Sequence, residues 1–459
     1  IHSGAFVGRE SELARLQGLL VRTQHGQGQL VFIAGPEGIG KTRLVHEVRR
    51  RAQMQGVLVC EGICHEHARI PYRPWLAIFR QVIAHYKSAQ PELLRMYDQT
   101  LVRLMPELSD ALGDITATDF GPEEHRHLLS AAANFLRASQ QPLMIVLEDL
   151  HYADAETITL LQAVGQQAQA GRLLVIGLYR DDELTDTHPL APLVKKAKAT
   201  DDATSSTYEL LRLGLLDEEA IETLVQSMLR LGHQAPAALP PALLPWLINE
   251  SGGNPVFIEN LLHSLIEGEQ LWFDGEVWHI EEGSLDHTAT DIQAAARRRL
   301  QSLDAATLEL LQWASIMGRW VDVDLLADVV ALSETEFTLR TEQAVQHYVL
   351  VAIEREQQRS YRFSNDQMRA AIYHTLAPEE RARRHAQIGD ALRERYPKAE
   401  VIELMAWHFE QAGKYDWAQR YARIAGDKAR QVYANNSAVQ HYTRALGFID
   451  SGQVERPPD

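Results

Sequence analysis

Two cysteines in 459 residues, Cys60 and Cys64, are too few for a disulfide framework, and the chain has no run of eighteen apolar residues and no signal peptide. Positive charge is also scarce, since 45 lysines and arginines stand against 62 aspartates and glutamates, for a formal net charge of −17. These absences argue against a secreted or membrane-spanning protein and against a broad basic surface for nucleic acid. We therefore expect a cytoplasmic protein with no direct DNA binding by this segment.

The length of the chain exceeds what one hydrophobic core usually holds and suggests about three domains. Its 45% apolar and 23% charged residues are those of an ordinary globular protein. The sequence begins Ile1-His2 without an initiator methionine and ends in a polar tail with Pro457-Pro458. We expect it to be part of a longer protein whose effector domain lies outside this segment.

One motif carries the chemistry that we expect. Residues 30–34 (LVFIA) read as a buried strand that runs into GPEGIGKT at residues 35–42, which is the G-x-x-x-x-G-K-[ST] pattern in its required setting. The glycines let the backbone N–H groups curl around phosphate oxygens, Lys41 can reach the β and γ phosphates, and Thr42 offers a hydroxyl to Mg²⁺. A helix over residues 41–51 aims its positive end at the same phosphates. ATP or ADP with Mg²⁺ is the expected cofactor, bound in this loop by Gly35, Gly38, Ile39, Gly40, Lys41, Thr42 and Arg43.

Catalysis at such a loop needs carboxylates from the end of a neighbouring strand. Residues 142–149 (PLMIVLED) place Glu148 and Asp149 directly after five apolar residues, and which of the two contacts the metal stays open. Residues 173–179 deliver Arg180 to a strand end, where it can sense the γ-phosphate or pair with Asp181 or Asp182. The expected catalytic residues are Lys41, Glu148, Asp149 and Arg180, with Thr42, Glu148 and Asp149 at the metal.

A second cluster, Cys60, Cys64, His65 and His67, has ligand types that suit zinc. Zinc sites favour separated pairs of ligands that can surround the ion, whereas these four residues crowd one strand end. We therefore expect no zinc site there.

Strand candidates recur between helical stretches at residues 31–34, 57–60, 143–147, 173–178 and 208–213. Strands that alternate with helices indicate an α/β domain with a parallel sheet covered on both faces, which we assign to residues 1–213. A polar break at residues 201–207 precedes the last strand.

The remainder reads as three further parts. Residues 214–287 should form a helical lid, with Asp217 capping a helix over 218–231, Pro240-Pro241 opening another, and a hairpin over 271–280 around Asp274-Gly275. Residues 288–378 read as a winged helix, with three or four helices and then strands at 349–354 and 361–363. Residues 379–459 should be helical, since small and aromatic positions at 418–425 recur at 438–445 as in tetratricopeptide repeats.

Together these motifs resemble the signal-transduction ATPases with numerous domains, the STAND class, especially bacterial regulators that carry an ATPase ahead of tetratricopeptide repeats. The resemblance covers nearly the whole chain and rests on seven stretches: FVGRE (6–10), GPEGIGKT (35–42), PYRPW (71–75), VLEDLHYAD (146–154), YRDDE (179–183), SGGNPVFIENLL (251–262) and YRFSNDQMRAAIYHTL (361–376). It implies an AAA-like nucleotide domain, a helical domain and a winged helix that closes over ADP in the resting state.

The resemblance also implies site residues. Val7, Gly8 and Arg9 would lie near the adenine and ribose, Pro255 would pack on the base, and Arg180 would hold the sensor position. Many relatives have Asp where this chain has Glu148, and His-Asp where it has Asn365-Asp366. The histidine of those relatives can contact the ADP phosphate, so Asn365 is expected at the nucleotide, where its neutral amide would make a weaker resting lock.

The leading interpretation is a slow, regulatory ATPase that an unidentified inducer switches from an ADP form to an ATP form, which self-oligomerises and drives an effector, most often transcription. A DNA-loading or motor ATPase of the origin-recognition type is the alternative. A basic recognition helix would favour this alternative. Residues 333–346, however, hold Glu334, Glu336 and Glu342 against Arg340 alone. In a third interpretation, nucleotide is structural and the helical tail alone has a function.

Overall fold

The computed structural model describes residues 4–66, 71–112, 122–199, 208–229, 238–281, 283, 285, 300, 303–355, 358–396 and 398–454. Its centre is a five-stranded parallel sheet in the order β2-β3-β4-β1-β5. The strands are β1 (Gln29–Ala34), β2 (Leu58–Ile63), β3 (Leu143–Glu148), β4 (Leu173–Tyr179) and β5 (Tyr208–Arg212). All five overlap the predicted strands, and the nearly continuous apolar runs of β1, β3 and β4 suit a sheet that is covered on both faces.

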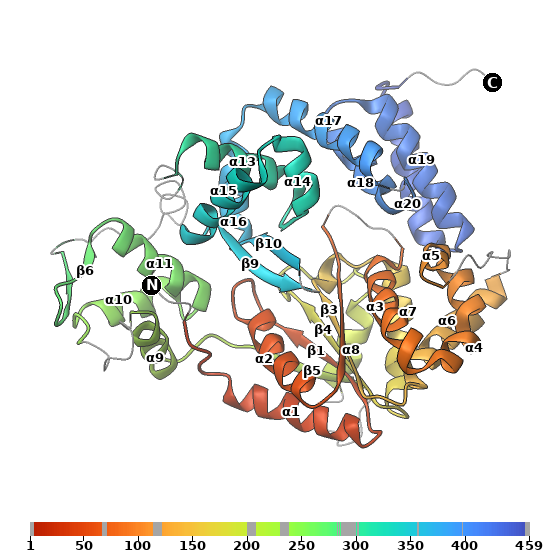
Figure 1. Ribbon diagram of the computed structural model, residues 1–459, viewed down its shortest axis with the longest axis horizontal. Coiled ribbons are helices and arrows are strands. Elements are labelled where there is room, and N and C mark those ends of the chain that lie inside the picture. The colour runs from red at the N-terminus through yellow and green to blue at the C-terminus, as the bar shows by residue number, and fades with distance from the viewer. Residues whose placement is uncertain are drawn as a thin grey trace.

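Helices cover the two faces of this sheet separately (Figure 1). Side chains alternate along each strand, so that Val31 and Ile33 of β1 meet one layer and Leu30 and Phe32 meet the other. The first layer consists of α1 (Glu10–Gln24) and α2 (Lys41–Met54). The second holds α3 (Arg73–Ala89), α4 (Pro91–Leu104), η1 (Pro106–Leu108), α5 (Ser109–Leu112), α6 (Pro122–Arg137), η2 (Leu150–Tyr152), α7 (Ala155–Ala168) and α8 (Ala191–Ala199).

A separate helical unit follows β5 and has its own apolar cluster. It consists of α9 (Glu218–Met228), α10 (Leu243–Ser251), α11 (Pro255–Glu267) and the antiparallel hairpin of β6 (Leu271–Phe273) and β7 (Trp278–Ile280). The hairpin and the Asp217 cap are confirmed, since the Asp217 carboxylate accepts from the Ala220 N–H at 2.9 Å. The helix expected to open at Pro240-Pro241 begins instead at Leu243.

Three helices and a small antiparallel sheet come next. They are α13 (Ala305–Met317), β8 (Trp320–Val321), α14 (Val323–Val330), α15 (Glu334–Gln346), β9 (Leu350–Arg355) and β10 (Gln358–Phe363), followed by α16 (Asp366–Thr375). The sheet order is β8-β10-β9. This is the order of helices and hairpin that the sequence predicts for a winged helix. The expected start of this part, at residue 288, lies outside the described residues.

Four long helices complete the chain: α17 (Pro378–Arg395), α18 (Lys398–Gln411), α19 (Tyr415–Gln431) and α20 (Asn435–Asp450). Small residues face aromatic rings between them, as predicted. A Cβ added to Gly426 would lie 2.6 Å from the Tyr442 ring, and one added to Gly389 would lie 3.0 Å from the Phe409 ring. The missing Cβ at these two positions therefore lets the rings pack close to the neighbouring helix.

Polar contacts join the long helices to the sheet domain. The Ser437 hydroxyl of α20 donates to the Glu156 carboxylate of α7 at 2.7 Å, and Lys428 of α19 lies 2.6 Å from the Glu107 carboxylate. The same helices share one apolar cluster with α13 to α16, which includes Leu310, Phe363 and Phe409. The last two parts of the chain therefore have a common core.

In the part of the chain that the structure describes, no helix has the length and apolar character needed to cross a membrane.

Candidate nucleotide site

The phosphate loop, residues 35–42, connects β1 to α2 at the carboxyl edge of the sheet. Gly35, Gly38 and Gly40 have φ values of 150°, 77° and 102°, a region where side chains are strained, so the loop needs these glycines. Gly38 also lies against the start of α11, where an added Cβ would be 2.8 Å from Asn254 Oδ1. The Asn254 amide donates to the Glu37 carbonyl oxygen at 2.9 Å. The helical unit thus holds the loop from outside.

Lys41 lies over the loop that carries it. Its ammonium donates to the carbonyl oxygens of Gly35 at 2.6 Å and Pro36 at 2.8 Å. Burial, and then the charge of Arg180, lower the pKa of Lys41 to about 8. A lysine held in this way gains a stronger partner when a phosphate enters the loop.

The two acidic candidates lie in different environments. Glu148 ends β3, is 6% exposed, and accepts from the Thr42 hydroxyl at 3.4 Å. Asp149 follows in a left-handed conformation with φ of 56°, which turns the chain away from the strand. Thr42 and Glu148 are therefore the pair whose oxygens meet where the sequence predicts Mg²⁺, while Asp149 lines a larger cavity beside them.

Arg180 is 4% exposed and lies among carboxylates from three parts of the chain. It donates to Asp366 of α16 at 2.6 Å and to Glu183, and its guanidinium lies 3.7 Å from Glu37 of the phosphate loop. Burial lowers the pKa of Arg180, but Glu37 and Asp366 outweigh it and raise that pKa above its ordinary value. Asp181, one of the two alternative partners, lies 3.5 Å from Arg212.

Arg319, between α13 and β8, completes this network. It lies 3.8 Å from Glu37 and 3.6 Å from Asp366, and the Asp366 N–H donates to Glu37 at 3.1 Å. We call Glu37, Arg180, Arg319 and Asp366 the clamp. It joins the phosphate loop to residues about 300 positions later in the chain.

A cavity of about 60 Å³ beside the loop brings together most of the residues expected at the base. Val7, Arg9, Ile39, Gly40, Arg43 and Pro255 all line it. Arg9 itself donates to the carbonyl oxygens of Gly214 and Ile39, so it braces the loop. Gly8 packs against α9, where an added Cβ would lie 2.7 Å from Ala220 Cβ.

Asn365 is buried and caps α16, its Oδ1 accepting from the Met368 N–H at 2.7 Å. The sequence did not predict this role. It fixes the first turn of α16 and thereby places Asp366 beside Arg180.

Three charged residues of this region escaped the sequence analysis: Glu37, Arg319 and Arg362. Arg362 lies on β10, and burial, followed by the charge of Arg319, lowers its pKa to about 10 although Glu148 and Asp149 oppose the shift. Arg362 stood within a recognised motif, but its strand β10 (QRSYRF) is largely polar, so the sequence pattern did not single it out. Glu37 occupies a variable position of the loop pattern, and nothing in the sequence marks Arg319.

The cluster considered for zinc is only partly described. Cys60 and Cys64 are buried and are not joined in a disulfide, and burial raises the pKa of Cys64. His67 lies outside the described residues. Over the ranges that the structure describes, no three histidine, cysteine or acidic side chains form a metal-binding group.

Residues 5–176 match the family model described as AAA ATPase domain, so the chain carries an AAA-type P-loop ATPase domain. The fold is similar to the crystal structure of a Signal Transduction ATPase with Numerous Domains (STAND) protein with a tetratricopeptide repeat sensor from Pyrococcus horikoshii. That likeness has a TM-score of 0.56 at 13% identity and covers 98% of this chain and 55% of the other. The resemblance predicted from the motifs is thus confirmed for the ATPase domain and for the fold.

Two curated relatives are also similar. An uncharacterized protein of Rhizobium meliloti is 24% identical over 96% of this chain, and a hybrid signal transduction histidine kinase G of Dictyostelium discoideum is 20% identical over 72% of it. The chain spans 42% of the first relative and 12% of the second.

Proposed function

We propose that this chain is an ATP- and ADP-dependent signal-transduction switch. ADP holds it closed, exchange for ATP in the presence of an inducer opens it, and the open form self-oligomerises and drives an effector domain, most often for transcription. Hydrolysis then restores the closed form. It is slow, because the protein works by a population shift between two states and not by turnover.

The clamp is the observation that carries this proposal. Arg180 is shared between Glu37 in the phosphate loop and Asp366 on α16. A γ-phosphate near Glu37 competes with Asp366 for the same guanidinium, whereas the shorter ADP leaves that pair intact. With ADP the contact between Arg180 of the sheet domain and Asp366 of α16 is therefore kept, and with ATP it is weakened.

The loop residues have the roles that their positions support. Lys41 exchanges its two carbonyl partners for phosphate oxygens, and Thr42 with Glu148 would hold Mg²⁺, which neutralises phosphate charge when bound. Asp149 is the candidate for orienting the attacking water. The cavity lined by Val7, Arg9 and Pro255 would take the base.

Nucleotide binding is tested by calorimetry with ADP and ATP on Lys41→Ala. We expect affinity to fall at least about tenfold, because the phosphates lose their main cation. Lys87→Ala, at an exposed site on α3, is the matched control and should bind as the parent does. Equal affinity in the Lys41 variant would refute the assignment of the loop.

Hydrolysis is tested on Glu148→Gln and Asp149→Asn. We expect Asp149→Asn to keep ATP affinity and lose about 100-fold or more in turnover, since a base contributes that much. Glu148→Gln should lose the Mg²⁺-dependent part of affinity because Glu148 meets the Thr42 hydroxyl. If both variants hydrolysed ATP at the parental rate, Glu148 and Asp149 would have a structural role and not a catalytic one.

A further inference from the structure

The small sheet of β8, β10 and β9 has one face in the C-terminal core and the other toward the sheet domain. In Figure 1, β9 and β10 lie between α13 to α16 and that domain. Tyr361 and Phe363 of β10 are buried in the apolar cluster of the C-terminal parts, so Arg362 between them points to the opposite face. The sheet is fixed beside the phosphate loop at both ends, because Arg319 precedes β8 and Asp366 follows β10.

The charged groups around Arg362 locate its guanidinium over the phosphate loop. Burial lowers the pKa of Arg362 to about 10, whereas Glu148 and Asp149, on the side where Mg²⁺ is expected, raise it. Burial raises the pKa of Glu259, which lines the cavity expected for the base, and Arg43 and Arg362 oppose this rise. A cation that acts on both groups lies between the metal side and the base side, which is where the β-phosphate of a bound nucleotide is expected.

The hydrogen-bond partner that Arg362 has within the protein is a neutral one. Among the described residues, its guanidinium donates one hydrogen bond, from Nη1 to the Phe363 carbonyl oxygen at 3.3 Å. Arg180, by contrast, donates to the carboxylates of Asp366 and Glu183. A charge-assisted bond to a phosphate is about twice as strong as a bond to a neutral oxygen, so a phosphate in the loop can replace the Phe363 carbonyl as the partner of Arg362.

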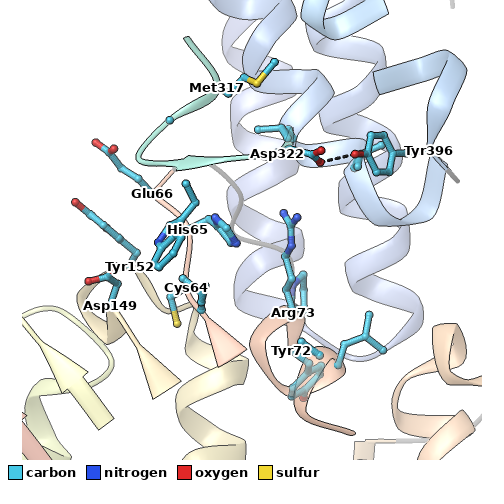
Figure 2. A pocket seen from close by; sticks show the side chains of 18 of the residues that line it. Cys64, His65, Glu66, Tyr72, Arg73, Asp149, Tyr152, Met317, Asp322 and Tyr396 are labelled. Atoms are coloured by element: carbon cyan, nitrogen blue, oxygen red, sulfur yellow. Dashed lines mark hydrogen bonds between the residues drawn. The ribbon is translucent and has the colours of Figure 1, made fainter. Parts of the chain in front are cut away.

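Beside the clamp, a cavity of about 430 Å³ separates the sheet domain from the C-terminal parts. Asp149 and Tyr152 lie on its sheet-domain side, and Met317 lies on the opposite side (Figure 2). Trp320 of β8 also lines this cavity. Little packing across this space has to be broken when the two sides move apart. The contacts at the phosphate loop, which include those of the clamp, therefore contribute much of what holds the small sheet in place.

We propose that Arg362 is a phosphate ligand of the closed form, which binds the β-phosphate of ADP from the small sheet. Asn365, the residue expected at that phosphate, has its Oδ1 bonded to the Met368 N–H, so a cation on β10 makes the contact instead. In the open form with ATP, the small sheet moves away and Arg362 leaves the phosphates. This difference between ADP and ATP rests on the function proposed above, whereas the contact itself requires only that the loop binds nucleotide.

Calorimetry with ADP and with ATP on Arg362→Gln tests this contact. We expect ADP affinity to fall at least about tenfold, because a charge-assisted bond is lost, and ATP affinity to fall less than about threefold. Arg362→Lys keeps the charge and should bind ADP within about threefold of the parent. Arg369→Gln is the matched control, since it removes another arginine of the same interface, which lies 3.4 Å from Glu66. It should change ADP affinity less than about twofold.

Each variant is first checked for the circular dichroism spectrum of the parent. Three results would overturn the contact: parental ADP affinity in Arg362→Gln, an equal loss in Arg369→Gln, or a loss in Arg362→Lys as large as that in Arg362→Gln. Equal losses of ADP and ATP affinity in Arg362→Gln would support the phosphate contact and contradict the opening on exchange. Parental ADP affinity in Arg362→Gln together with loss of binding in Lys41→Ala would reject this inference alone, whereas parental affinity in Lys41→Ala would reject the nucleotide site itself.

Discussion

At the scale of single residues, Arg180 is the cation that carboxylates from the phosphate loop, the turn after β4 and α16 share. Replacing it with glutamine leaves Glu37, Glu183 and Asp366 close together with Arg319 as their remaining clamp partner. We expect Arg180→Gln to lower the free energy of unfolding by at least about 2 kcal/mol, since breaking a buried ion pair costs up to about 5. Asp366→Asn should cost less, because Arg180 keeps two acidic partners. Urea unfolding measures both.

Arg172→Gln is the control for this comparison, because Arg172 is exposed just before β4. A larger loss in Asp366→Asn than in Arg180→Gln would show that Asp366, and not the shared cation, organises the clamp.

How far single residues could be predicted depended on whether their role is local. The loop glycines, Lys41, Thr42 and Glu148 could be singled out because each lies in, or directly at the end of, one short local pattern, and their roles stay predictions. Glu37 and Arg319 were missed because their role is an ion pair between residues about 300 positions apart in the sequence. Arg9 was expected at the nucleotide; it lines the small cavity beside the loop, and its guanidinium also donates to the carbonyl oxygens of Ile39 and Gly214, which the sequence did not predict.

At the scale of elements, α16 depends on its cap. Asn365→Ala removes the acceptor of the Met368 N–H and should cost about 1 kcal/mol, whereas Asn365→Asp keeps an acceptor and should cost less. Because the cap orients Asp366, we expect Asn365→Ala also to release ADP faster than Asn365→Asp does. Thermal unfolding and fluorescent ADP release give the two measurements. Equal rates of ADP release from both variants would show that the cap of α16 does not affect the clamp.

Helix α7 carries a pH-dependent cap. Asp154 accepts from the N–H of Thr157 at 2.7 Å and from its hydroxyl, and burial raises the pKa of Asp154 to about 7. The unfolded value is about 4, so the folded chain takes up the proton first as pH falls. This contribution to stability is fully present below about pH 4 and is lost as pH rises through 7.

Asp154→Asn removes that titration and keeps a capping oxygen. Between pH 5.5 and pH 8 the parent should therefore lose more unfolding free energy than Asp154→Asn does, as measured by denaturant midpoints at both values. Identical losses would place the pKa of Asp154 near its ordinary value.

Elements were more predictable than their ends. Strands β1, β3 and β4 are apolar almost throughout, so composition located them, whereas β2 (LVCEGI) and β5 (YELLR) mix apolar and charged residues. Helix α10 begins at Leu243, two residues after Pro241, and not at the two prolines. Periodicity reports which face is buried, and the last turn of a helix contributes little to it.

At the scale of the whole molecule, the net negative charge of the chain disfavours binding to nucleic acid. Helix α15 has Arg340 as its one basic residue, and Arg340 is bonded to Asp304 at 2.8 Å. We expect no shift of duplex DNA in electrophoresis even at low salt, where phosphate contacts are strongest. Tight binding at moderate salt would support the DNA-loading alternative.

The expected boundary at residues 378–379 separates two sequence patterns, yet one apolar cluster crosses it. Ile388 and Leu392 of α17 belong to the same cluster as Leu310 of α13. Sequence patterns mark where a repeat begins, but which faces are buried together depends on three-dimensional packing.

The position of Trp320 on the cavity wall, directly after Arg319, has a spectroscopic consequence. Trp75 is the one tryptophan of residues 1–213, and it is fully buried with its indole N–H bonded to the Thr157 carbonyl at 3.0 Å. Its emission should therefore stay constant when the clamp opens. Trp320 meets the cavity, so a change in emission that disappears in Trp320→Phe would provide an intrinsic optical signal of opening that needs no label.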